Sequence, residues 1–144
     1  QPYVVFPGEF VAPERVLTQL IEVKGAWRPN FKRPLFILLD ATWSEARKMF
    51  KKSPYLNTLP VLSLAPEQIS CYTLRRSRRA DHFCTAEVGA LCLALAGEGL
   101  AAQTLQAYLE VFSHHYLEAK HQRRVDGQSE AHLRLRALRP QGGF

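Results

Sequence analysis

The chain contains few cysteines and no long hydrophobic run, and both absences limit what it can be. Its three cysteines, Cys71, Cys84 and Cys92, are odd in number and lack the close pairing of a metal-binding knuckle. We therefore expect reduced thiols and assign no metal site. No segment approaches the roughly 20 apolar residues that a membrane-spanning helix needs. No signal peptide precedes Val4, so we expect a cytoplasmic protein without a membrane partner.

The charge, by contrast, is strongly unbalanced. The chain has 19 Lys and Arg residues against 13 Asp and Glu residues, a formal net charge of +6. A surplus of this sign favours a polyanionic partner, most simply a nucleic acid. The basic residues gather in two clusters, Arg75, Arg76, Arg78 and Arg79 in one and Arg47, Lys48, Lys51 and Lys52 in the other. A basic cluster is as often a solvated surface, but two around one candidate site favour phosphate contact.

Strand and helix signals alternate over the first 64 residues, which predicts an α/β domain with helices on both faces of an open, mostly parallel sheet. The expected strands are Tyr3–Phe6, Leu35–Leu39, Leu59–Leu64 and a short one at Ser70–Leu74. The second of these reads as a strand buried on both faces, because its residues are all apolar.

Helices are expected between and after these strands. Their ranges are Pro13 to about Gly25, Thr42 to Ser53-Pro54, Thr85 to Ala96 with Gly97 as its stop, and Leu100 to about Arg123. The first should present Val16 and Leu17 on its apolar side. The length of 144 residues fits one domain, with residues 1–126 as its folded part and residues 127–144 as a basic, mobile C-terminal tail.

The segment Leu35 to Trp43 is the most informative part of the chain, because an apolar run ends abruptly in a carboxylate, a hydroxyl and an indole. Asp40 would lie at the carboxyl end of a strand, the edge at which open α/β sheets bind ligands. Thr42 and Glu45 fit a capping box, which makes Thr42 more consistent with a helix cap than with a catalyst. Residue type alone favours core packing for Trp43.

The motif Asp-Ala-Thr-Trp at 40–43 resembles the D-x-T-W signature of the DTW-domain family, the tRNA-uridine aminocarboxypropyltransferases. Other segments match the family in order and spacing: Val5–Gly8, Leu59-Pro60, Tyr72–Arg76 and Cys84–Val88, the last with Val88 where Ala is common. The resemblance implies a SPOUT-like fold with a C-terminal trefoil knot that forms the S-adenosylmethionine pocket. Family members usually carry a cysteine-rich segment ahead of this domain, and none stands before Tyr3 here.

The resemblance also implies a reaction, in which the 3-amino-3-carboxypropyl group of S-adenosylmethionine moves to N3 of a uridine in tRNA and methylthioadenosine leaves. Asp40, Thr42 and Trp43 are the implied catalytic residues. Asp40 acts as a base if burial against Leu38, Leu39 and Trp43 raises its pKa. Alternatively it stays ionised and positions the uridine or balances the sulfonium charge.

The binding residues follow from the same motifs. The cofactor is expected at Pro7, Gly8, Leu39, Leu59, Pro60, Leu64, Ala65, Thr85 and Glu87. Glu87 equally fits the first turn of a helix, where the macrodipole favours a negative charge. The tRNA phosphates are expected at Arg75, Arg76, Arg78 and Arg79, then at Lys48 and Lys52. Two other functions fit the sequence, a SPOUT-type RNA methyltransferase and a non-catalytic RNA-binding module, and the oligomeric state is left open.

Overall fold

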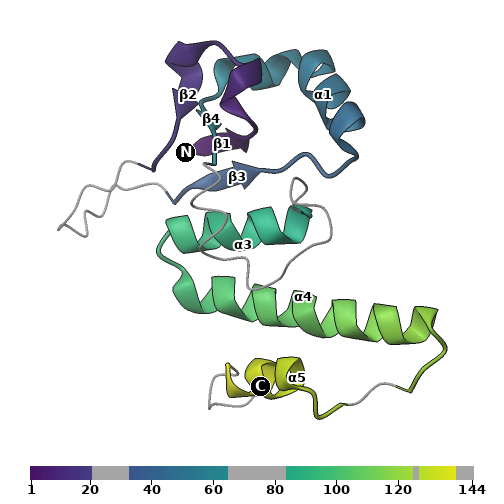
Figure 1. Cartoon of the computed structure of the whole chain (residues 1–144). Helices are drawn as coiled ribbons and strands as arrows, with labels where there is room; N and C mark the ends of the chain where they lie inside the picture. Colours follow the sequence, from purple (N-terminus) through teal and green to yellow (C-terminus); the bar gives the residue numbers. More distant parts are fainter. Residues whose placement is uncertain (21–32, 65–83, 125–126, 139–144) are drawn as a thin grey trace. The chain divides into compact units, whose positions relative to one another are not determined.

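The computed structural model describes residues 1–20, 33–64, 84–124 and 127–138 (Figure 1). The chain divides into two compact units, Gln1–Thr85 and Ala86–Phe144. The boundary between them lies inside the segment expected to fold as one domain. No helix within the described ranges is both long enough and apolar enough to cross a bilayer.

Within its described residues, the first unit is built on a four-stranded, fully parallel sheet with the strand order β2-β4-β1-β3. The strands are β1 (Pro2–Val5), β2 (Val16–Leu17), β3 (Leu35–Ile37) and β4 (Val61–Leu62). Backbone bonds from Val4 N–H to the Pro60 carbonyl at 3.0 Å and from Phe6 N–H to the Leu62 carbonyl at 3.2 Å extend the pairing of β1 with β4. The predicted α/β class and parallel sheet are confirmed.

Strand β3 lies at an edge of the sheet, which corrects one expectation. Leu35 is 62% exposed, and Phe36 and Ile37 are only partly buried. The prediction of a strand buried on both faces was wrong because β3 pairs with β1 alone among the described strands. The fully buried strand is β4, whose two residues are both shielded from solvent.

The prediction of a helix that begins at Pro13 is also wrong. Residues Pro13–Arg15 form a single 3₁₀ turn, η2, and Val16 and Leu17 then enter strand β2 beside Val61 and Leu62. The Arg15 side chain fixes this turn, because its Nη2 donates to the Leu56 carbonyl at 2.7 Å and to the Leu59 carbonyl at 2.8 Å. Pairing with a distant strand therefore overrides the local apolar spacing. Residues 21–25 of the expected helix lie outside the described ranges.

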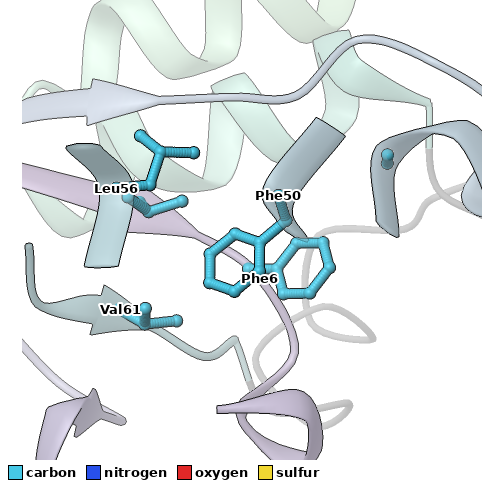
Figure 2. Packing of buried hydrophobic residues seen from close by; sticks show 6 residues of the cluster. Phe6, Phe50, Leu56 and Val61 are labelled. Carbon is cyan, nitrogen blue, oxygen red and sulfur yellow. The ribbon is translucent and has the colours of Figure 1, made fainter. Parts of the chain in front are cut away.

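Helix α1 (Trp43–Lys52) packs on one face of the sheet and ends as predicted, before Pro54. The short 3₁₀ helix η3 (Pro54–Thr58) follows and buries Leu56. Phe6 from the end of β1 and Phe50 from α1 stack almost in parallel, with ring centroids 4.5 Å apart (Figure 2). Val4 and Val61 from the sheet complete this core cluster with Ala46 of α1.

The second unit contains α4 (Gly99–Lys120), α5 (Glu130–Ala137) and nearly all of α3 (Thr85–Leu95). Helix α3 stops where the sequence predicts, because Gly97 adopts a φ of +82°. The Gly97 N–H donates to the Ala94 carbonyl, and the Glu98 N–H donates to the Leu93 carbonyl. These two bonds are the pair that defines a Schellman motif.

Helix α5 was not anticipated by the sequence, which placed residues 130–137 in a mobile tail. It packs on α4, buries Ala131 and joins Arg134 to Glu110 of α4 by a 3.3 Å ion pair. His132 of α5 also lies 2.8 Å from His115 of α4, measured between their Nε2 atoms. Part of the C-terminal segment is therefore ordered helix.

Candidate functional site

Three of the segments predicted to bind or act on the substrate meet at one edge of the sheet. Because all four strands run in parallel, their carboxyl ends lie together. Strand β1 leads into Pro7-Gly8, β4 into Ser63-Leu64 and β3 into Leu38–Asp40. The sheet topology alone therefore assembles these segments, which lie far apart in the sequence.

Gly8 and Ser63 join the first two segments directly. The Gly8 N–H donates to the Ser63 hydroxyl at 3.0 Å. A Cβ at position 8 would lie 2.8 Å from Val16 Cγ1 and 3.2 Å from Ser63 Oγ, so the close approach requires glycine. The sequence analysis missed Ser63, although a hydroxyl directly after a buried strand was a signal for it. The turn at Gly8 therefore packs closely against the segment that follows β4.

Asp40 receives a hydrogen bond from a second motif of the chain. The Thr85 hydroxyl donates to Asp40 Oδ1 at 2.6 Å, across a separation of 45 residues. Asp40 is exposed, so the alternative in which it is buried against Leu38, Leu39 and Trp43 does not match the structure. Its second oxygen, Oδ2, has no hydrogen-bond partner among the described residues and can accept a bond from a ligand. The carboxylate is thus oriented from one side and open on the other.

Thr42 serves as the helix cap that the sequence predicts. Its N–H donates to Glu45 Oε2 at 3.1 Å, and its hydroxyl also donates to that oxygen. These bonds form part of a capping box at the start of α1. They also lower the pKa of Glu45, mainly through the hydroxyl of Thr42. The hydroxyl of Thr42 is therefore already engaged by Glu45 within the capping box.

Trp43 is only partly packed. Its ring stacks on Phe6 with centroids 5.5 Å apart and meets Phe10 at 5.4 Å, but 40% of the residue is exposed. Core packing therefore accounts for one side of the indole. The remainder faces solvent next to the Asp40 loop.

The other predicted cofactor residues divide into two groups. Leu39 and Leu59 pack against the core, and the Pro60 carbonyl bonds to β1, so their backbones hold the sheet edge in place. Pro7 is exposed, Leu64 is partly buried, and Glu87 belongs to the second unit. Ala65 lies outside the described residues. The exposed carboxylate of Asp40 suits a ligand that carries positive charge.

The predicted basic residues are described only in part. Lys48 and Lys52 are exposed on α1, together with Lys51, while Arg47 is partly buried. Arg75, Arg76, Arg78 and Arg79 lie outside the described ranges, as does the strand expected at Ser70–Leu74. Of the residues predicted to contact tRNA, the described ones therefore both lie on α1.

Comparison with known families shows to which family the chain belongs. The model of the DTW domain family matches residues 1–117. The chain belongs to the DTW family. This confirms the resemblance seen in the Asp40–Trp43 motif and places both Asp40 and Thr85 inside the DTW domain. The match ends within α4, so α5 lies beyond it. No solved structure matches this DTW protein.

Proposed function

We propose that this DTW protein transfers the 3-amino-3-carboxypropyl group of S-adenosylmethionine to N3 of a uridine in tRNA and releases methylthioadenosine. The observation that carries the proposal is the hydrogen bond between Asp40 and Thr85, because it joins two motifs of the family at the ligand-binding edge of a parallel sheet. The reaction takes place on tRNA, so we expect it in the cytoplasm. Residues 1–126 form the catalytic part, and residues 127–144 extend it with a basic C-terminal segment.

The fold proposed for the complete domain is SPOUT-like, with the chain threaded into a C-terminal trefoil knot. The parallel sheet and the position of Asp40 at its carboxyl edge agree with such a fold. The knot itself follows from the family resemblance.

Asp40 acts on the proton of uridine N3 in this proposal. N3 is a poor nucleophile while it carries its proton, so a positioned acceptor accelerates the reaction. The Thr85 bond holds Oδ1, and Oδ2 accepts the N3 hydrogen. As N3 forms its bond to carbon, the bond from that carbon to sulfur breaks, its electron pair stays on sulfur, and the N3 proton passes to Asp40.

S-adenosylmethionine supplies the electrophilic carbon and the neutral sulfur leaving group. The residues proposed to hold it are Pro7, Gly8, Leu39, Leu59, Pro60, Leu64, Ala65, Thr85 and Glu87. Their part is to hold the aminocarboxypropyl chain, rather than the methyl group, in line with the nucleophile, because the sulfonium has three electrophilic carbons. Trp43 borders this region and would limit how the uridine enters.

The tRNA backbone is proposed to contact Lys48 and Lys52 on α1, together with Arg75, Arg76, Arg78 and Arg79. Exposed cations on α1 support this assignment, since phosphate contacts dominate the affinity of most nucleic-acid complexes. Such contacts would position the tRNA without reading its sequence.

Mass spectrometry of nucleosides from tRNA incubated with the chain and S-adenosylmethionine tests the proposal. The expected product is aminocarboxypropyluridine, with one methylthioadenosine released for each modified uridine. A methylated nucleoside would instead indicate a methyltransferase. Unmodified tRNA, together with binding of tRNA but not of S-adenosylmethionine, would indicate an RNA-binding module.

A further inference from the structure

An aromatic and cationic surface continues from the candidate site along α1. Phe10, at the end of the 3₁₀ helix η1 (Gly8–Phe10), lies beside Trp43 with ring centroids 5.4 Å apart. The guanidinium carbon of Arg47 lies 4.5 Å from the centroid of the Phe10 ring. We call Phe10 and Arg47, with Trp43 at their side, the Phe10–Arg47 platform.

The platform rests on a rigid base. Phe6 and Phe50 below it are buried and stacked, and both Phe10 and Trp43 contact Phe6. Phe10 is nevertheless 38% exposed, similar to Trp43. Two large aromatic side chains therefore form an outer layer that the core supports but does not cover.

The position of the platform links it to the DTW motif. Trp43 follows Thr42 directly, and Arg47 lies one helical turn further along α1. Lys51 lies a further turn away on the same side, since residues four apart on a helix are neighbours. Glu45 is the one acidic residue of α1 and is not part of this row, so the row that begins at Trp43 carries the positive charges of Arg47 and Lys51.

We propose that the Phe10–Arg47 platform stacks a base of single-stranded RNA next to the uridine that is modified, while Lys51 contacts the phosphate that follows. Aromatic rings and guanidinium planes are the surfaces on which proteins stack unpaired bases. The positive row complements the phosphate backbone, which identifies RNA rather than an apolar partner as the occupant. This inference rests on the proposed function, because it assumes that RNA is the substrate.

The test measures tRNA affinity over a range of salt concentrations for the full chain and its variants. Phe10→Leu keeps an apolar side chain over Phe6 but removes the π face, so we expect affinity to fall about 5- to 100-fold with an unchanged salt slope. Phe10→Tyr should restore binding. Arg47→Lys keeps the charge but loses the planar group, and it should weaken binding without changing the slope. Lys51→Ala should reduce the slope by about one.

Two controls separate this inference from the proposed function. Tyr55→Ala removes another aromatic residue of the same unit, which is 71% exposed, and should leave tRNA affinity unchanged. S-adenosylmethionine binding, measured by calorimetry, should be equal in Phe10→Leu and the unmodified chain. If the chain modifies tRNA but Phe10→Leu and Arg47→Lys bind it as well as Tyr55→Ala does, the platform is overturned while the proposed function stands. If tRNA gains no aminocarboxypropyl group but Phe10→Leu weakens binding, the platform stands and the transferase fails.

Discussion

The Thr85 hydroxyl donates a 2.6 Å hydrogen bond to Oδ1 of Asp40, and this bond joins the first residue of α3 to the loop that follows β3. It holds Oδ1 of the carboxylate at the carboxyl edge of the sheet, while Oδ2 has no hydrogen-bond partner among the described residues. In the proposed reaction the hydroxyl of Thr85 positions Asp40, in addition to the place of Thr85 among the residues proposed to hold the cofactor.

Replacing Thr85 by Val should therefore lower kcat by about 10- to 100-fold. A hydrogen bond to a charged group contributes roughly 1.5–3 kcal/mol, and each 1.4 kcal/mol or so corresponds to a factor of ten in rate. Thr85→Ser should recover most of the rate, because it restores the hydroxyl. Thr104→Val, which removes a hydroxyl bonded to the Leu100 carbonyl in α4, is the matched control. Full activity in Thr85→Val would show that the bond has no catalytic consequence.

Gly8→Ala should destabilise the first unit by about 1–3 kcal/mol, because the added methyl group would collide with Val16 and Ser63 in a packed turn. Gly99→Ala provides the control, since nothing lies within 4 Å of a Cβ at that position. Urea unfolding of both variants measures the difference. Equal midpoints for the two would contradict the close approach of Gly8 to Ser63.

Acid should weaken the start of helix α1 through Glu45. The bonds from Thr42 lower the pKa of Glu45 below its ordinary value of 4.5. A carboxylate whose pKa is lowered by folding adds stability above its unfolded pKa, and that stability is lost as the pH falls through the folded value. The dependence of unfolding midpoints on pH below about 5 should therefore be shallower in Glu45→Gln. The same slope in both proteins would show that the capping box contributes nothing in solution.

Cys92 should resist alkylation much more than Cys84. Burial raises the pKa of the Cys92 thiol from 9.0 to about 11, whereas Cys84 is exposed. At pH 8 the thiolate of Cys92 is therefore scarce as well as shielded. Iodoacetamide labelling followed by peptide mass spectrometry should find Cys84 modified first and Cys92 only after unfolding. Equal labelling rates in the folded protein would contradict the burial of α3 at this position.

The sequence predicted best where a local signal determines the structure. The Thr42–Glu45 pair and Ser53-Pro54 predicted the two ends of α1, and Gly97 predicted the end of α3. All three signals act within one or two helical turns. Local rules therefore succeed at helix ends.

Long-range contacts account for what the sequence did not predict. Val16 and Leu17 became a strand because they pair with Val61 and Leu62, and no local pattern encodes that partner. The exposure of Asp40 has a similar origin, since β3 is an edge strand among those described. Resemblance in motifs, rather than periodicity, placed Thr85 in the same site as Asp40. The bond between their side chains became visible only in the structure.

The account depends most on which carbon of S-adenosylmethionine reaches the tRNA. Two preparations of the cofactor, one labelled with ¹³C in the methyl group and one in the aminocarboxypropyl chain, should be incubated separately with tRNA and the chain, with Asp40→Asn in parallel. We predict that only the aminocarboxypropyl label enters a uridine, and that Asp40→Asn abolishes or greatly slows the transfer while the protein remains folded. Entry of the methyl label, or undiminished transfer by Asp40→Asn, would contradict the account.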